Sequence, residues 1–381
     1  MSTTLPHHEV EPDGAPLGPL PRPLRRVLGS RLVEILTAPH GPSRYLEQVS
    51  PLWSLDETRA VVTDVREETA DTTTLTLTPT EWTGARAGQH VRITVGIDGV
   101  RRTRAFSISS SAHRDDGRLQ ITVKANPDGH VSRFLAHRAR PGLIVGVEPG
   151  DGQFVLPAAR PDDLLLISGG SGITPVMSML RTLVDEGHTG RVRFAHYARG
   201  SDDVIFAEEL ARLGETPNVE VTVVLTGEED PRATLRGRIC REHLDVLAPD
   251  RHLTETFVCG PAGLLDVVDE VWSAEGLTER LHTERYQSPS SGDTLTDAGG
   301  TITFTSSAIT VDSDGRSLLE QAEDAGLEPD FGCRMGICHG CVQRKPRGPV
   351  RDVRSGAVAD EEDQDIQLCI TVPLDDVEIE L

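Results

Sequence analysis

Four cysteines in the last part of the chain have the spacing that a [2Fe-2S] cluster requires. Cys333, Cys338 and Cys341 follow the pattern C-x4-C-x2-C, and Cys369 lies further along. Two tetrahedral irons bridged by sulfide need four soft thiolates, and this spacing is their plant-type arrangement. A zinc site or two disulfides would also use four cysteines, but zinc ribbons pair two C-x2-C knuckles and only one is present here. The sequence favours the cluster, which would make the protein an electron carrier.

Glycines lie between or beside these thiolates, at Gly332, Gly336 and Gly340. A residue without a Cβ lets its backbone N–H turn toward a cluster sulfur, and such hydrogen bonds tune the reduction potential. The glycine pattern therefore agrees with an iron–sulfur centre.

A second chemical signal is the segment Gly169-Gly-Ser-Gly-Ile-Thr-Pro175. It follows the uninterrupted apolar run 164–168, which is typical of a buried parallel strand, and it leads into a predicted helix over 175–184. Backbone in such a loop approaches a pyrophosphate closely, and the helix N-terminus favours its charge. The segment departs from the Rossmann fingerprint G-x-G-x-x-G.

The elements that would position these residues follow from periodicity. Short alternating strands punctuated by Gly and Pro predict a small barrel, at 59–65, 73–78, 90–95, 104–109 and 119–124. After residue 160 the pattern becomes that of a doubly wound α/β domain, with further strands at 192–197, 219–225 and 256–259 and helices at 204–213 and 262–275. The expected parts are a disordered tail (1–19), an N-terminal helical segment (20–56), the barrel (57–158), the α/β domain (159–286), a linker (287–298) and a final cluster domain (299–381).

The N-terminal helical segment is basic although the chain is acidic. Apolar residues recur at helical spacing with arginines between them, at Leu24, Val27, Leu28, Leu32, Ile35 and Leu36. Residues 20–44 hold five arginines and one acidic residue. Such a helix suits either packing on the barrel or contact with a membrane surface or membrane-bound partner.

Composition narrows the class of protein. Length allows two or three domains, and two cysteines besides the cluster ligands are no disulfide framework, so we expect a reducing, cytoplasmic compartment. We expect no signal peptide and no spanning helix. A net charge of -22 argues against nucleic-acid binding. Residues 299–381 carry 7 Lys/Arg against 17 Asp/Glu, so either a basic docking surface on a redox partner or a plain solvated surface would explain the excess.

The barrel strand contains Arg104-Ala-Phe-Ser107. Here the chain resembles the ferredoxin–NADP reductase superfamily, whose Arg-x-Phe-Ser motif implies that Arg104 pairs with a flavin phosphate, Phe106 packs on the flavin and Ser107 lies near N5. A second element, the glycine turn and helix start at 129–135, resembles the family's phosphate segment. The flavin residues expected from both elements and a neighbouring strand are Arg104, Ala105, Phe106, Ser107, Thr122, Lys124, Gly129, His130, Val131 and Ser132. We expect FAD, with FMN as the alternative.

The glycine segment likewise matches that family's Gly-Gly-x-Gly-Ile-Thr-Pro, and Cys259-Gly-Pro261 matches its Cys-Gly-Pro. The resemblance implies that the Cys259 thiol borders the nicotinamide. Without it, a strand-end cysteine is usually a small buried hydrophobe. The nucleotide residues expected are Gly169, Gly170, Gly172, Ile173, Thr174, Pro175, Arg199, Ser201, Cys259, Gly260 and Pro261. Among these and the flavin residues, the candidate catalytic positions are Ser107, Thr174 and Cys259.

Nucleotide preference depends on the segment Tyr197-Ala-Arg-Gly-Ser201. Arg199 and Ser201 could hold a 2′-phosphate, and no acidic residue precedes Asp202 there to bind a 2′-hydroxyl. The sequence favours NADPH over NADH, although an exposed loop without a ligand would look the same.

The order of flavin barrel, nucleotide domain and β-grasp [2Fe-2S] ferredoxin domain resembles actinobacterial NADPH oxidoreductases associated with fatty-acid desaturases. The resemblance implies transfer of hydride from the nucleotide to the flavin, and then of single electrons through the cluster to a membrane-bound desaturase. Peripheral membrane contact through residues 20–44 would fit that partner. Two other functions stay open, namely the reductase of a soluble ring-hydroxylating or acyl-CoA oxygenase and a non-catalytic flavin and iron–sulfur redox sensor.

Overall fold

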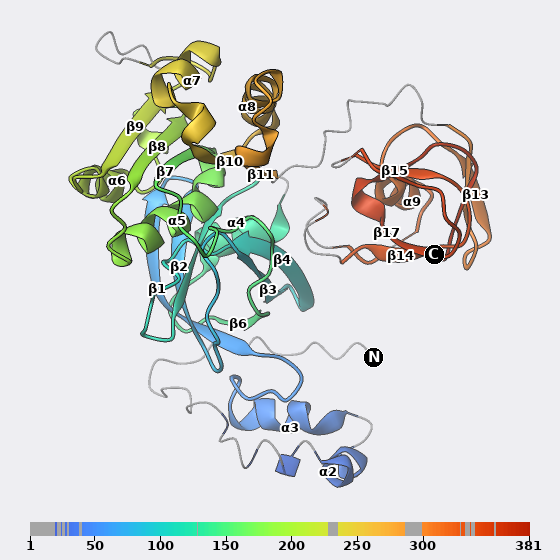
Figure 1. Ribbon diagram of the computed structural model, residues 1–381. Coiled ribbons are helices and arrows are strands. Elements are labelled where there is room, and N and C mark those ends of the chain that lie inside the picture. Colours follow the sequence, from blue (N-terminus) through green and yellow to red (C-terminus); the bar gives the residue numbers. More distant parts are fainter. Residues whose placement is uncertain are drawn as a thin grey trace. The chain divides into compact units, whose positions relative to one another are not determined.

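The computed structural model describes residues 20, 24, 27–28, 30–37, 40–127, 129–227, 235–285, 299–327, 329–331, 336, 340–353 and 356–381. They fall into two compact units (Figure 1). One comprises Met1–Gly260 with Leu264–Glu284, and the other comprises Pro261–Gly263 with Arg285–Leu381. The disordered tail expected over 1–19 and the linker expected over 287–298 lie outside the described residues.

The first unit begins with the expected antiparallel barrel. Its strands are β1 (Arg59–Thr69), β2 (Thr72–Pro79), β3 (His90–Ile97), β4 (Val100–Ser107), β5 (Leu119–Lys124) and β6 (Ile144–Val147), in the order β4-β3-β6-β1-β2-β5. Beyond β4, the Ser109 N–H donates to the Gln120 carbonyl of β5 at 2.8 Å, so the two outer strands meet. Helix α4 (His130–Arg138) adds Val131 and Leu135 to the barrel core. Strand β6 was not predicted, because four residues are too few for an alternating pattern.

The doubly wound α/β domain is also confirmed. Strands β7 (Asp163–Gly169), β8 (Arg191–Ala198), β9 (Val219–Leu225) and β10 (Glu255–Gly260) pair in parallel, with β11 (Leu281–Arg285) beside β10. Helices α5 (Ile173–Asp185), α6 (Ala207–Leu213), α7 (Arg241–Leu247) and α8 (Ala262–Ala274) follow β7 to β10 in turn. The chain continues from β7 to β8 on one side and returns to place β10 on the other side, so the strand order reverses between β7 and β10. Ligands of such sheets bind at this switch point.

The helices α6 and α7 of this domain differ most from the sequence prediction. Helix α6 starts at Ala207 and not at Val204, because Val204 is extended and Phe206 is left-handed, with φ 61°. Helix α7 was not predicted. Its seven residues are too few to show a clear helical period.

The N-terminal segment contains short helices where one was expected. Helix α2 (Arg31–Leu36) ends at Thr37, and α3 (Gly41–Val49) begins after a break at which Gly41 has φ +71°. Helix α3 is fastened beside the barrel because the Leu55 N–H donates to Ser43 Oγ at 3.1 Å and Glu47 pairs with Arg59 of β1. No helix among the described residues is both long and apolar enough to cross a bilayer.

The second unit is the expected β-grasp domain. Its strands are β12 (Thr301–Phe304), β13 (Ile309–Asp312), β14 (Val342–Lys345), β15 (Val350–Asp352), β16 (Val358–Ala359), β17 (Gln364–Gln367), β18 (Thr371–Pro373) and β19 (Val377–Ile379). Strand β12 pairs antiparallel with β13 and parallel with β19. Helix α9 (Leu318–Asp324) starts with a capping box of Ser317 and Glu320 and packs Leu318 and Leu319 into the core.

Candidate functional site

The glycine segment and Cys259 meet at the carboxyl edge of the parallel sheet. Strands β7 and β10 pair so that Cys259 lies opposite Ser168. A Cβ at Gly172 would lie 2.2 Å from the Cys259 carbonyl oxygen, and a Cβ at Gly260 would lie 3.0 Å from the Gly169 nitrogen. Side chains at these positions would therefore force the loop away from β10. The glycines let two segments far apart in sequence form one surface.

This surface fits a pyrophosphate. Gly170–Gly172 forms one 3-10 turn, and helix α5 begins directly after it at Ile173. Gly170 has φ +54°, and nothing lies within 4 Å of its missing Cβ, so the outer side of the turn is open. The Thr174 hydroxyl donates to the Ser171 carbonyl at 3.1 Å, and Pro175 is buried in the first turn of α5. A thirteen-residue helix that starts at an open glycine turn presents N–H groups and a partial positive charge to an anion.

The predicted 2′-phosphate residues follow the neighbouring strand at the same edge. Strands β7 and β8 pair in parallel with Gly169 opposite Tyr197, so Arg199 lies just beyond that edge. Arg199 and Ser201 are exposed, and the Arg199 carbonyl accepts the Gly227 N–H at 2.9 Å. The ends of β7, β8 and β10 therefore bring the predicted nucleotide residues Gly169 to Pro175, Arg199, Ser201, Cys259 and Gly260 to one edge of the sheet. Pro261 directly follows the last residue of β10.

A buried carboxylate beside Cys259 is new in the structure. The Cys259 thiol is fully buried and lies 4.0 Å from Oε2 of Glu284, whose side chain comes from β11 and is itself buried. This carboxylate lies beside Cys259 at the carboxyl edge of the sheet, where it can bind a proton or a polar group of a ligand. The only signal in the sequence was the segment Glu284-Arg285-Tyr286, which resembles the superfamily's terminal aromatic; Tyr286 lies outside the described residues.

The two predicted flavin elements both belong to the barrel. Arg104 to Ser107 form the end of β4, where Arg104 donates to the Thr103 carbonyl at 2.7 Å and Ser107 is buried. Helix α4 contacts both β4 and β5. A Cβ at Gly129 would lie 2.3 Å from the Ser132 hydroxyl, which accepts the Asn126 N–H at 3.1 Å, so a larger residue at position 129 would have to displace this hydroxyl. Val131 is buried in the barrel core and His130 is exposed.

Two predicted flavin residues already have partners inside the barrel. The Thr122 hydroxyl is buried between those of Thr74, at 2.8 Å, and Ser109, at 2.9 Å. The Lys124 ammonium pairs with Asp71 at 2.5 Å. Burial opposes ionisation of Asp71, but hydrogen bonds, with that from Lys124 the largest, outweigh it and lower its pKa. Flavin contact by Thr122 and Lys124 stays a prediction. Strand β5, which carries both, contacts the Gly170–Gly172 turn and so joins the flavin and nucleotide elements.

Two of the four predicted cluster ligands are described, and both are buried. The Cys341 sulfur accepts the Cys369 N–H at 3.4 Å, and the Cys369 sulfur accepts the Gly336 N–H at 3.3 Å. Gly336 has φ +70°, which favours glycine, as its predicted role requires. Backbone donors aimed at cysteine sulfurs suit thiolates that bind a cluster. Cys333 and Cys338 lie outside the described residues.

Known protein families match these three parts in the same order. The oxidoreductase FAD-binding domain matches residues 59–156, the oxidoreductase NAD-binding domain matches 166–270, and the 2Fe-2S iron-sulfur cluster binding domain matches 302–374. An NADPH oxidoreductase of Mycobacterium tuberculosis is 38% identical over 353 residues, which cover 91% of this chain and 90% of the relative. The chain belongs to the ferredoxin–NADP reductase superfamily, in the branch that carries a [2Fe-2S] domain.

Two further proteins are similar to this chain over most of its length. The ferredoxin reductase component of 3-ketosteroid-9-alpha-monooxygenase from Mycolicibacterium smegmatis is 31% identical over 76% of this chain and 86% of the relative. The structure of phthalate dioxygenase reductase shares the fold, with a TM-score of 0.57 over 85% of this chain and 97% of that chain, at 21% identity. The expectations of FAD, a [2Fe-2S] cluster and NAD(P)H are therefore confirmed, and the protein is an NAD(P)H-dependent oxidoreductase. FAD supplies the chemistry that splits a hydride pair into the single electrons that a cluster accepts.

Proposed function

We propose that this oxidoreductase takes hydride from NADPH and delivers single electrons to an oxygenase-type acceptor protein, most specifically a membrane-bound fatty-acid desaturase. The observation that carries the proposal is the main-chain contact of Gly172 with Cys259 at the switch point of the sheet, next to barrel strand β5. Relatives whose names describe reductase components of monooxygenases support an oxygenase-type acceptor.

Within this function, each predicted site residue has a proposed role. The start of α5 and Gly169 to Gly172 bind the nucleotide pyrophosphate, while Cys259 and Thr174 border the nicotinamide. Arg104 and the turn at Gly129 bind flavin phosphate, and Ser107 lies beside the flavin ring. The remaining flavin and nucleotide residues support these contacts, and Cys333, Cys338, Cys341 and Cys369 bind the cluster.

NADPH is the proposed donor because Arg199 is an exposed guanidinium just beyond the carboxyl edge of β8. A guanidinium fork suits the doubly charged 2′-phosphate that distinguishes NADPH from NADH.

Exposed apolar side chains in the N-terminal segment support a membrane-bound acceptor. Ile35 and Leu36 at the end of α2 are 68% and 75% exposed, and Val49 of α3 is 60% exposed. Leu24, Val27 and Tyr45 add further exposed apolar surface. Exposed apolar groups on short helices within a stretch of five arginines suit the interface of an anionic membrane. Helix α3 also contacts the barrel, because Glu47 pairs with Arg59 of β1.

The experiment replaces Ile35 and Leu36 with Ser and measures co-sedimentation with vesicles of anionic and of neutral lipid. Leu253→Ser with Val246→Ser is the matched control, because these residues are 62% and 56% exposed in the nucleotide domain. We expect weaker binding to anionic vesicles and slower electron delivery to desaturase-containing membranes, with unchanged ferricyanide reduction. Equal sedimentation of the variant and the wild type would contradict the membrane-bound acceptor.

A soluble oxygenase is the second candidate acceptor, and the similarity of this chain to reductase components of monooxygenases favours it. It requires no membrane contact. The two candidates therefore separate in the same experiment, because a soluble acceptor predicts no dependence on Ile35 and Leu36.

A further inference from the structure

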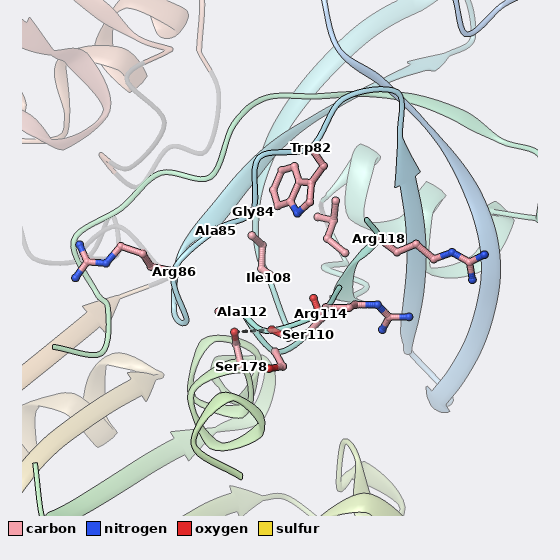
Figure 2. Close-up of a pocket in the computed structure, with 12 residues that line it drawn as sticks. Trp82, Gly84, Ala85, Arg86, Ile108, Ser110, Ala112, Arg114, Arg118 and Ser178 are labelled. Atoms are coloured by element: carbon pink, nitrogen blue, oxygen red, sulfur yellow. Dashed lines mark hydrogen bonds between the residues drawn. The ribbon is translucent and has the colours of Figure 1, made fainter. Parts of the chain in front are cut away.

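One face of helix α5 forms hydrogen bonds with the backbone that follows β4, the strand with the predicted flavin residues, which we call the flavin strand. Ser178, Arg181 and Thr182 share this face because they are three and four residues apart. The Ser178 hydroxyl donates to the Ser110 carbonyl at 2.7 Å, the bond drawn in Figure 2. The Arg181 guanidinium donates to the Ser109 carbonyl. The Thr182 hydroxyl accepts the Ala112 N–H at 3.0 Å and donates to the Ser178 carbonyl.

Arg181 is itself held from the other side. Its Nε and Nη2 donate to the two Glu209 carboxylate oxygens of α6, at 2.8 and 2.6 Å, and its guanidinium lies 4.6 Å from the centre of the Phe206 ring. Burial opposes ionisation of Glu209, but the hydrogen bond from Arg181 and nearby positive charge outweigh it and lower its pKa. The Glu209 carboxylate therefore stays charged near neutral pH. The Arg181 side chain is only 11% exposed and makes these two parallel hydrogen bonds, so it is held in one position.

These contacts join the two halves of the predicted hydride-transfer site. Helix α5 begins at Ile173, directly after the glycine turn, and the segment 109–112 begins two positions beyond Ser107. Because a helix is stiff over such a length, its hydrogen bonds to residues 109, 110 and 112 can fix where the end of β4 lies relative to the nucleotide loop. Hydride transfer depends steeply on such spacing, because the reacting atoms must come within about 3–3.5 Å of each other.

We infer that Ser178, Arg181 and Thr182 are positioning residues that set the spacing between the flavin strand and the nucleotide loop for hydride transfer. The inference rests on the proposed function of these two elements. In a purely structural role, the same contacts would only hold the barrel and the α/β domain together. Removing the contacts would then lower the stability alone, whereas in a positioning role it would also slow hydride transfer.

The test uses the full-length holoprotein and three variants. Arg181→Met removes the polar bonds but keeps an apolar stem against Phe206, and the double variant Ser178→Ala with Thr182→Val removes only hydroxyl groups. Arg251→Met is the matched control. Arg251 pairs with Glu275 at 2.9 Å and lies 5.8 Å from the Trp272 ring, but all these contacts stay within the nucleotide domain.

Four quantities are measured for each variant: FAD content, the midpoint of thermal unfolding, amide hydrogen exchange of residues 109–112, and flavin reduction at saturating NADPH. Flavin reduction is repeated with NADPH deuterated at the transferred hydrogen. For Arg181→Met we expect unchanged FAD content, faster exchange at 109–112, flavin reduction slower by about 10- to 100-fold and a larger isotope effect. The NADPH concentration for half-maximal rate should change little. The hydroxyl double variant should change in the same direction by a smaller factor.

The control separates positioning from stability. Arg251→Met should lower the unfolding midpoint without slowing flavin reduction or changing the isotope effect. Flavin reduction in Arg181→Met as fast as in Arg251→Met would overturn the inference. If Arg181→Met lost FAD, an unchanged rate and isotope effect in the hydroxyl double variant would overturn it equally. Failure of NADPH to reduce the flavin of the wild type would instead contradict the proposed function.

Discussion

Gly172 and Cys259 touch main chain to main chain, since a Cβ at residue 172 would lie 2.2 Å from the Cys259 carbonyl oxygen. The contact joins the turn after β7 to the end of β10, the two strands on either side of the point where the strand order reverses. A ligand bound at that edge would therefore contact both segments at once.

Replacing Gly172 with Ala should separate these segments. Because backbone atoms cannot move aside cheaply, we expect a loss of about 1–3 kcal/mol in the free energy of unfolding and a higher KM for NADPH. Denaturant unfolding and steady-state ferricyanide reduction measure the two effects. Gly96→Ala is the control, since nothing lies within 4 Å of its missing Cβ, and it should change neither quantity by a comparable amount. A Gly172→Ala protein with wild-type stability and KM would show that the contact is not required.

The parts that the sequence predicted are those with a signal of their own. Alternation in the barrel strands and the apolar run of β7 indicated the fold, and glycines at Gly172 and Gly336 indicated close backbone approach. Arg181 carried no such signal. Its partner Ser109 contributes a main-chain carbonyl, which has no signature in sequence, and α5 and the barrel loop come together only in the tertiary structure. The start of α6 was misplaced because left-handed Phe206 is unusual for a residue with a Cβ.

Arg199 should determine the nucleotide preference. If its guanidinium binds a 2′-phosphate, Arg199→Ala should weaken the use of NADPH by about 1.5–3 kcal/mol in kcat/KM and change the use of NADH little. Steady-state kinetics with both nucleotides measure the ratio, and exposed Arg212→Ala in the same domain is the control. Equal losses with NADPH and NADH would refute this role.

His196 should make stability depend on pH. Complete burial lowers its pKa from 6.5 to about 4, although a hydrogen bond with the Ser168 backbone opposes this shift. The unfolded state therefore binds a proton between these values that the folded state does not. The stability from neutral His196 is fully present above pH 6.5 and is lost as the pH falls toward 4.

A His196→Gln variant lacks this titration. Between pH 7 and pH 5 the wild type should lose roughly 2 kcal/mol more unfolding free energy than the variant, as measured by denaturant unfolding at each pH. For the exposed control His252→Gln, the difference from the wild type should stay constant. If the unfolding free energies of the wild type and His196→Gln also differed by the same amount at every pH, buried His196 would not contribute to the acid sensitivity.

Cys369 should be required for the cluster but not for hydride transfer. Its sulfur is buried and accepts the Gly336 N–H. Cys369→Ser should abolish the [2Fe-2S] visible absorption and cytochrome c reduction and leave FAD content and ferricyanide reduction largely intact. Cys240→Ser, at a free thiol in the nucleotide domain, should change none of these. Cytochrome c reduction that survived in Cys369→Ser would show that electrons leave the protein without passing the cluster.

The central claim is that electrons from NADPH reach the [2Fe-2S] centre through the flavin. Anaerobic addition of NADPH to the full-length holoprotein, followed by rapid-freeze electron paramagnetic resonance and visible absorption, tests this directly. The account predicts that flavin absorption decreases first and that the signal of a reduced [2Fe-2S] cluster then develops, whereas Cys369→Ser shows only the first change. A cluster that stays oxidised while the flavin is fully reduced, or that becomes reduced in protein stripped of FAD, would contradict it.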